Sequence, residues 1–167
     1  NYDNSVQAGE INPNGSGTTH GTMVAGVLGA IGNNSVGVAG VNWYSTILPI
    51  QALDDDSYGD SLTVSEAIHY AVDQGSDVIS ISFGTNQEDP YIREAVQYAT
   101  DHNVLVVAAS GNDGCNCINY PANYPEVISV GALDRNNVSA SFSNYGRNLD
   151  ILAPGEGMTS TYWTPTN

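Results

Sequence analysis

The sequence predicts an α/β fold built on a mostly parallel sheet with helices on both faces. Short segments with strand character alternate along the chain with segments whose apolar residues recur at helical period. Residues 104–109 form a continuous apolar run, which is typical of a strand covered on both faces of a sheet. Strands that alternate with helices of about a dozen residues favour βαβ units, whose strands run parallel.

The elements follow in order after a polar start. Residues 1–18 are rich in Gly, Asn and Ser and indicate a surface loop. Apolar residues recur at helical spacing over 20–31, with small residues between them, which predicts a buried helix. Beyond it we expect a strand at 47–50, a helix with its apolar stripe over 62–72 and Gly75 at its end, a strand at 77–83, a helix capped by Asp89 and begun by Pro90, and strands at 104–109, 127–132 and 149–153.

Composition narrows the class of protein. The 167 residues suit a single domain, and no apolar run approaches the ~18 residues of a membrane span, so we expect no membrane partner. The chain has eighteen acidic residues but only three Arg and no Lys. The resulting net charge of -15 makes nucleic acid a poor partner. An acidic surface attracts cations, so bound Ca²⁺ and a secreted, extracellular protein fit better. We expect any secretion signal to be absent or already removed.

Two polar residues stand where reactive groups gather in open parallel sheets, at the carboxyl ends of strands. His20 begins a predicted helix, from which its ring can project toward that edge. Asn112 follows the most apolar strand, and its neutral carboxamide can donate an N–H group to a developing oxyanion. Taken singly, each residue also has a plain structural interpretation, His20 as a core histidine at a helix start and Asn112 as a turn residue.

Their surroundings favour chemistry. HGTMVAG at 20–26 and AASGN at 108–112 resemble the histidine and oxyanion motifs of the subtilisin-like serine proteases, the subtilases. In that family the two residues are about ninety positions apart, and here the separation is 112 − 20 = 92. Later segments resemble the family's core, and the resemblance covers about residues 19–157. It implies that residues 1–167 are a single, partial subtilase catalytic domain, and the segments concerned are YPANYPEVISVGA, ASFSNYG and LDILAPG.

The resemblance implies a serine endopeptidase that hydrolyses peptide bonds in proteins through an Asp/His/Ser triad. His20 would act as general base and then as general acid, and Asn112 would stabilise the oxyanion. In the family's order the aspartate lies about thirty residues before the histidine and the serine falls at about position 177 of this numbering. The sequence contains neither motif. Flanking segments or a companion chain would then supply both residues, and this segment alone is expected to be inactive.

The same resemblance implies a groove that binds a peptide or protein substrate as an added strand. Phe83 is bulkier than the small aliphatic residue expected at its position, which alters the shape of the specificity pocket. The implied groove residues are Ser82, Phe83 and Gly84 on one edge, Ala109, Ser110 and Gly111 at the base of the pocket, and Ser57, Tyr58 and Gly59 on the opposite edge.

Calcium is the cofactor that the resemblance implies. One site would use Asn34, Val36 and Val38, although this Asn/Gly-rich segment is equally a plain turn and would need a carboxylate from upstream. A weaker cation site would use the carbonyl groups of Ala122, Tyr124 and Val127, beside a cis bond between Tyr120 and Pro121. We interpret the acidic run 54–56 as a solvated surface and His69 and His102 as structural residues.

Several alternatives stay open at this stage. Cys115 and Cys117 are more readily a disulfide that stiffens a loop than free thiols or half of a metal site, although so short a loop would be strained. The chain is an active endopeptidase segment or, as an alternative, an inactive subtilase-fold domain that binds a peptide or a partner. A nucleotide-binding domain is disfavoured because the glycines of 26–32 lie inside a helical stripe, and no motif supports a glycosidase.

Overall fold

The computed structural model describes residues 16–54 and 56–162. The chain divides into two compact units, which are described separately: the first unit comprises residues 1–60 and 159–167, and the second unit residues 61–158. The single partial domain expected from the sequence stays a prediction. Across the described part of the chain, no helix combines the length and the apolar character needed to cross a membrane.

The first unit is organised around one helix, α1, Ser16–Gly29. The chain returns along its carboxyl end, where the backbone N–H groups of Gly40, Val41 and Asn42 donate to the carbonyl groups of Ala30, Val27 and Leu28 at 2.8–3.0 Å. These bonds satisfy carbonyl groups that a helix end leaves unpaired. The small residues of α1 allow close approach, because a Cβ at Gly26 would meet Thr161 Oγ1 at 2.2 Å.

Three expectations for the first unit are wrong. Residues 16–18, expected to belong to a surface loop, are helical, so α1 begins at Ser16 and His20 is its fifth residue, not its first. Residues 47–50 form no strand, because a strand needs a hydrogen-bonded neighbour and no described residue pairs with this segment. The helix is also not buried. Over residues 19–29 only Gly26 is buried, and 37% of the surface of Met23 and 38% of that of Leu28 is exposed to solvent. An apolar stripe marks the side of a helix that can be covered, and the described residues of this unit cover only part of it.

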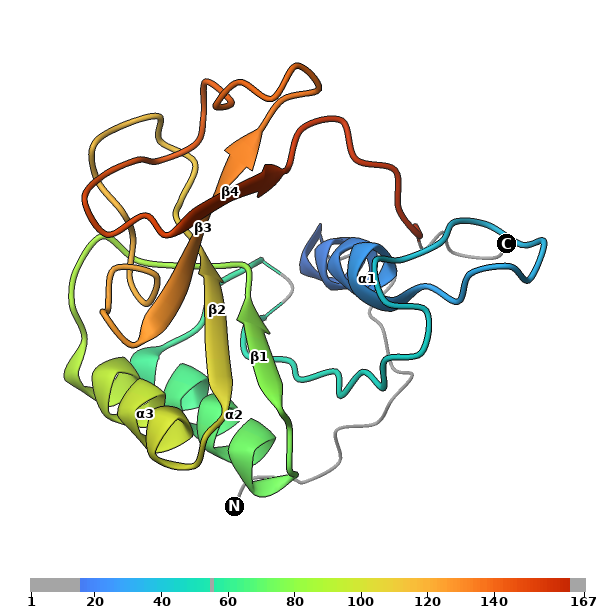
Figure 1. Cartoon of the computed structure of the whole chain (residues 1–167). Helices are drawn as coiled ribbons and strands as arrows, with labels where there is room; N and C mark the ends of the chain where they lie inside the picture. The colour runs from blue at the N-terminus through green and yellow to red at the C-terminus, as the bar shows by residue number, and fades with distance from the viewer. Residues whose placement is uncertain (1–15, 55, 163–167) are drawn as a thin grey trace. The chain divides into compact units, whose positions relative to one another are not determined.

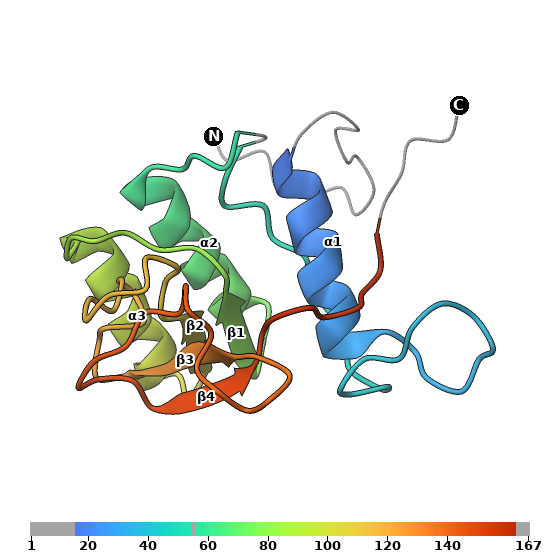
Figure 2. The same cartoon turned by 90° about the horizontal axis from the view of Figure 1, so that it is seen from above.

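The second unit is built on four parallel strands in the order β1-β2-β3-β4 (Figures 1 and 2). Its helices α2 and α3 pack on each other and lie on the same side of the sheet. The prediction of an α/β fold with a parallel sheet is confirmed. The ends of the four observed strands differ from the predicted ends by no more than two residues. The elements are α2 Ser61–Asp73, β1 Val78–Ile81, α3 Pro90–Asp101, β2 Leu105–Ala109, β3 Val127–Leu133 and β4 Ile151–Pro154.

The ends of both helices follow the signals in the sequence. Asp89 Oδ1 accepts hydrogen bonds from the backbone N–H groups of Tyr91 and Ile92 at 2.9 and 3.2 Å, and Pro90 is the first residue of α3. Gly75 has φ +77° after α2, and its N–H donates to the Val72 carbonyl. A left-handed glycine at this position closes a helix. The start of α3 and the end of α2 therefore lie where the sequence places the capping residues.

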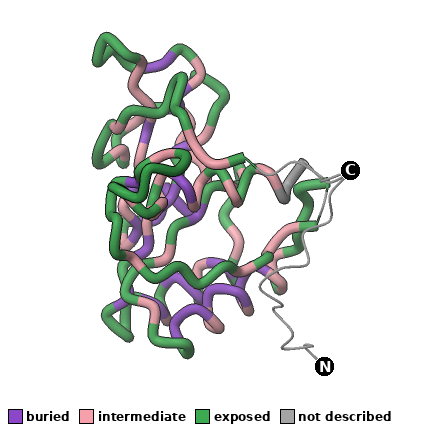
Figure 3. Tube along the Cα trace, turned by 90° about the vertical axis from the view of Figure 1, so that its right-hand side faces the viewer, coloured by how far each residue is buried: buried purple, intermediate pink, exposed green. Residues whose placement is uncertain are grey.

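The core lies between the two helices and one face of the sheet. Partnered residues of parallel strands share a face, so the pairs Ile81–Ala108 and Val106–Val127 point to the same side. All four are at most 4% exposed, and Figure 3 shows buried stretches in purple that recur along the coiled segments of the chain. On the opposite face Val78, Leu105 and Ile151 keep between 43% and 53% of their surface. Within residues 61–158, helices cover one face of the sheet only.

We predict that Asp89→Ala lowers the free energy of unfolding by about 1 kcal/mol, because it removes the cap of α3. The hydrogen bond that Ser61 donates to Asp89 lowers the pKa of this carboxyl group, ahead of the bonds from Ile92 and Tyr91, while desolvation opposes them. The ionised form is therefore stabilising above the unfolded pKa of about 3.9, and this contribution is lost as pH falls through the lower folded pKa.

Urea unfolding of wild type, Asp89→Ala and Asp89→Asn from about pH 6 to about pH 3 tests both the contribution of the cap and its dependence on pH. Asn caps a helix as well as Asp does, so Asp89→Asn keeps the cap and loses the charge. We expect the difference between wild type and Asp89→Asn to shrink as the pH falls. A difference that does not change with pH would contradict the assigned role of the carboxylate.

Candidate active site

Two groups of predicted substrate residues leave the sheet at the same edge. Ile81 of β1 is the register partner of Ala108 of β2, and the strands run parallel. Ser82–Gly84 and Ala109–Gly111 therefore follow the carboxyl ends of neighbouring strands, the edge at which open α/β sheets bind ligands. Beyond them Thr85 and Tyr120 exchange backbone hydrogen bonds of 2.9 and 2.8 Å in an antiparallel bridge.

The edge after β1 is open to a ligand. Ser82 and Gly84 are exposed and Phe83 is half-buried. Gly84 is required by packing, since a Cβ there would lie 2.8 Å from the Tyr120 carbonyl oxygen. The backbone beyond β1 is thus pressed against the segment that carries Tyr120, while its other side remains accessible.

Ser110 has a structural environment. It is 1% exposed, its Oγ donates to the Asn144 carbonyl at 3.1 Å, and its backbone N–H donates to the Val130 carbonyl at 2.9 Å. Its own carbonyl accepts from Asn119 N. Ser110 can therefore shape the base of a pocket, but its side chain is turned into the protein. The adjacent Ala109 is exposed.

The side chain of Asn112 is exposed to solvent. The residue is exposed, lies three positions after the end of β2, and makes no side-chain hydrogen bond to any residue in 16–54 or 56–162. A carboxamide without a protein partner keeps both N–H bonds available to a ligand. This is the environment that an oxyanion donor requires before substrate arrives.

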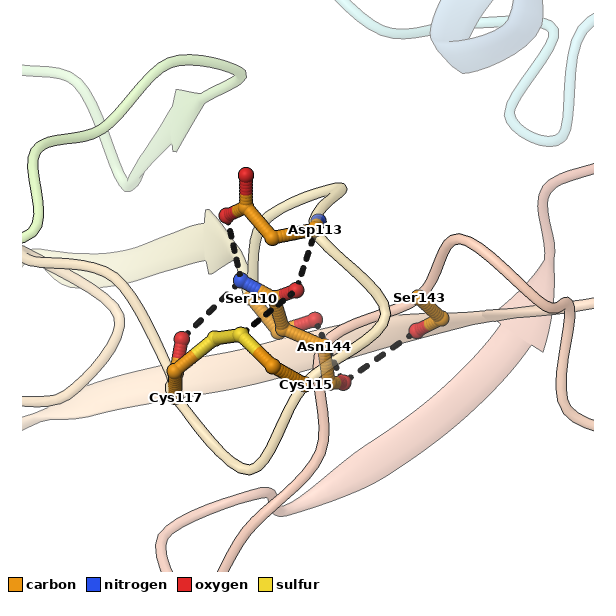
Figure 4. Close-up of a disulfide and its surroundings, with 6 residues drawn as sticks. All are labelled: Ser110, Asp113, Cys115, Cys117, Ser143 and Asn144. Atoms are coloured by element: carbon orange, nitrogen blue, oxygen red, sulfur yellow. Dashed lines mark hydrogen bonds between the residues drawn. A yellow bond between two sulfur atoms is a disulfide. The ribbon is translucent and has the colours of Figure 1, made fainter.

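Asn144, a residue that the sequence analysis missed, holds the loop around Asn112 (Figure 4). It is 0% exposed. Its Nδ2 donates to Asp113 Oδ2 at 3.1 Å and to the Cys117 carbonyl at 2.9 Å, and its Oδ1 accepts from Asp113 N at 2.7 Å. The only signal in the sequence was a place in ASFSNYG, which has no apparent chemistry on its own.

Cys115 and Cys117 form a disulfide within the same loop, which confirms the favoured interpretation of the pair. Asp113 lies close enough that its carboxylate and the two sulfur atoms are all within 4.8 Å of one another. Because both sulfur atoms are bonded to each other, neither is available as a thiolate ligand for a metal.

The remaining predicted residues of the active site lie in the first unit. His20 is exposed on α1. Ser57, Tyr58 and Gly59 are exposed in a turn that Asp54 holds, since its Oδ1 accepts from the backbone N–H groups of Asp56 and Tyr58 at 3.0 and 2.9 Å. Ser57 takes φ +67° in this turn. His20 and Asn112 belong to different units, so their convergence stays a prediction.

Comparison with known proteins decides the family. The model of the subtilase family matches residues 1–167, the whole chain. The chain belongs to the subtilase family. The inference from two motifs and their spacing is therefore confirmed at the level of family.

Individual subtilases and related proteases agree with this assignment. Thermitase of Thermoactinomyces vulgaris is 43% identical over 151 residues, which cover 90% of this chain and 54% of that protein. Subtilisin BL of Lederbergia lenta is 43% identical over 146 residues, 87% of this chain and 54% of the relative. A mutant of the protease domain of PatA has a TM-score of 0.80 at 34% identity, over 87% of this chain and 55% of that structure. This subtilase chain thus spans about half the length of the relatives it matches.

The loop expected to bind calcium offers neutral oxygen atoms. Asn34 Oδ1 accepts from Val36 N at 3.0 Å, and Asn33, Ser35 and Gly37 have φ between +56° and +61°. Asn34 and Val36 are exposed and Val38 is half-buried. No carboxylate of the described residues joins this loop in a metal-binding group, and the upstream residues expected to supply one lie outside the described ranges. The residues present suit part of a calcium shell.

The second cation site of the subtilase resemblance is less open. The Tyr120–Pro121 peptide bond is cis, as expected. Ala122, Tyr124 and Val127 are buried, and the Tyr124 carbonyl already accepts from Val127 N at 3.1 Å. Burial raises the pKa of the Tyr124 phenol, whose O–H donates to the Asp89 carbonyl. This segment therefore anchors the start of α3.

The two other histidines are structural, in agreement with the sequence analysis. His69 Nε2 lies 3.3 Å from Glu94 Oε2 between α2 and α3, and both His69 and His102 contact the Tyr98 ring, with centroids 4.5 and 4.1 Å away. The hydrogen bond that Tyr98 donates to Asp73 raises the pKa of its phenol. These side chains form contacts between α2 and α3 and near the end of α3.

We predict that Gly111→Ala destabilises the protein more than Gly157→Ala does. Both glycines have positive φ, +110° and +69°, and an L-residue in such a conformation costs about 1–2 kcal/mol. A Cβ at Gly157 would meet nothing within 4 Å, whereas one at Gly111 would lie 2.2 Å from Asn144 Nδ2. We expect an extra loss of about 1–3 kcal/mol for Gly111→Ala, measured by denaturant unfolding. Equal losses would show that Asn144 does not pack as described.

Proposed function

We propose that this chain forms the histidine and oxyanion half of a serine endopeptidase site. The proposal is supported by membership of the subtilase family and by the HGTMVAG and AASGN motifs. The single observation that carries it is the exposed Asn112 carboxamide at the carboxyl edge of a parallel sheet, which has no side-chain partner within residues 16–54 and 56–162. A buried or internally bonded carboxamide at this position would have supported only a structural role.

In this proposal His20 moves the proton and Asn112 holds charge. The His20 imidazole accepts the proton of the attacking serine hydroxyl and later gives it to the amine of the leaving peptide. The developing negative charge on the carbonyl oxygen accepts a hydrogen bond from Asn112 Nδ2. The nucleophilic serine and the aspartate that orients His20 would come from flanking segments or a companion chain.

The substrate would be an extended peptide or protein segment. Exposed backbone groups beyond β1, at Ser82–Gly84, would pair with it as an added strand, and Ala109–Gly111 would form the base of the specificity pocket. The opposite edge would come from Ser57–Gly59. Phe83, which is half-buried, lies within this pairing segment. We further propose that the protein is secreted, for which its excess of acidic residues gives general support.

We predict that a fluorophosphonate probe labels the whole protein that contains this chain, and that His20→Ala abolishes the labelling because it removes the base. Asn112→Ala should retain the labelling and lower kcat by about 10²–10³-fold, the loss found when this donor is removed from subtilisin itself. Asn136→Ala is the matched control, since Asn136 is exposed in a turn and its side chain donates a hydrogen bond to Asp134, away from the loop of Asn112 in the sequence. An unlabelled but folded protein that still binds peptide would favour the inactive, partner-binding alternative.

We propose calcium as a structural cofactor held in part by the loop 33–38. When bound, the ion would crosslink the loop to upstream carboxylates and stabilise the folded state, by about 2.7 kcal/mol at a hundredfold excess over Kd. We predict that EDTA lowers Tm and that added Ca²⁺ restores it.

Asn34→Ala should reduce this EDTA-sensitive part of Tm. Asn42→Ala is the control, because Asn42 Oδ1 accepts from Tyr44 N at 3.2 Å in the same manner, outside the loop. Differential scanning calorimetry with and without EDTA measures the change in Tm for each variant, and we expect a smaller change for Asn34→Ala than for Asn42→Ala. A wild-type Tm that does not respond to EDTA would contradict the calcium site.

A further inference from the structure

The backbone on both sides of Asn112 is bonded to one residue, Asn144. The carbonyl of Gly111 accepts from Asn144 N at 3.0 Å, and the N–H of Asp113 donates to Asn144 Oδ1 at 2.7 Å. The peptide groups before and after Asn112 are thus held by the main chain and the side chain of the same buried residue. Asn112 itself lies between them without a partner for its side chain in the described structure.

The Asn144 carboxamide has few bonds left to make elsewhere. Its two N–H groups reach Asp113 Oδ2 and the Cys117 carbonyl, and its oxygen accepts from Asp113 N. Cys115 Sγ lies 3.9 Å from that oxygen, so the disulfide packs against it (Figure 4). Hydrogen bonds of a fully buried carboxamide are stronger than those made in water, and an unmade one is costly.

Asn144 is itself fixed on its other side. Its carbonyl accepts from Ser110 Oγ at 3.1 Å and from Ser143 Oγ at 3.3 Å. The neighbouring Tyr145 N donates to the Cys115 carbonyl at 2.9 Å. The segment around Asn144 is therefore a rigid support, tied to the end of β2 through Ser110 and to the disulfide loop through Cys115.

We propose that Asn144 is a positioning residue for the oxyanion donor. Since Asn112 has no side-chain partner among the described residues, the direction of its carboxamide depends on its own backbone, and Asn144 fixes that backbone from both sides. Preorganised donors stabilise a transition state only when they already point at the developing charge. The inference rests on the proposed function, because it concerns the same site.

The test is a double-mutant cycle on kcat in the whole protein, with a peptide substrate. We expect Asn144→Ala to lower kcat about ten- to a hundredfold, as for a displacement of about 1 Å at a catalytic group, with KM nearly unchanged. In an Asn112→Ala background the same substitution should have almost no further effect on kcat, because the group that it positions is already gone. Asn136→Ala again serves as the control.

Each outcome separates this inference from the proposed function. If Asn112→Ala lowers kcat and Asn144→Ala lowers it by the same further factor in both backgrounds, Asn144 is merely structural and the inference is wrong. If Asn112→Ala leaves kcat unchanged, the oxyanion role of Asn112 is wrong, whatever Asn144 does.

A second variant keeps the test decisive if Asn144→Ala does not fold. Asp113→Ala removes one acceptor of the Asn144 carboxamide from an exposed position, and Asp113→Asn restores an acceptor without the charge. We expect a several-fold loss of kcat for Asp113→Ala, no loss in the Asn112→Ala background, and recovery in Asp113→Asn. Faster exchange of the backbone amide hydrogen of residue 113, which is bonded to Asn144 Oδ1, should accompany the loss in Asp113→Ala. Unchanged kcat and unchanged exchange would overturn the inference.

Discussion

The second unit depends on the parallel register of β2 between β1 and β3. Val106 pairs with Ile79 on one side and with Val127 on the other, and Ser110 extends the ladder by one residue through its bond to the Val130 carbonyl. This register sends the segments after β1 and β2 out at one edge. A shift of β2 would move its buried residues to other depths in the core and carry Asn112 away from the edge at which Ser82–Gly84 leave the sheet.

Beyond the ends of β1 and β2, close contacts between loop residues determine the path of the backbone, in place of regular secondary structure. Glycine at 84 and 111 lets the chain approach Tyr120 and Asn144 more closely than any Cβ would permit. A buried carboxamide and a disulfide hold the loop that follows β2. The result is a rigid backbone that carries the exposed carboxamide of Asn112.

The parts of the fold that the sequence predicted are those with local signals. The cap at Asp89, the closing glycine at 75 and the strands at 104–109 and 127–132 each follow from residues a few positions apart. The expected strand at 47–50 and the buried state of α1 were wrong because both depend on distant partners that cover the segment. Asn144 was missed for the same reason, since its five hydrogen-bonded neighbours, residues 110, 111, 113, 117 and 143, acquire meaning only when the chain has folded.

The central prediction of the proposed function is that the imidazole at position 20 and the carboxamide at position 112 face a common point at the carboxyl edge of the parallel sheet. A nitroxide attached at position 20 of the whole protein tests it through the side-chain amide signals of asparagines in a nitrogen-15 NMR spectrum. Asn103 is the internal reference, since it precedes β2 at the amino edge of the sheet and Asn112 follows β2 at the carboxyl edge. The account predicts strong broadening of the Asn112 signals and little of those of Asn103. If the Asn112 signals stay as sharp in the nitroxide-labelled protein as those of Asn103, the prediction is contradicted.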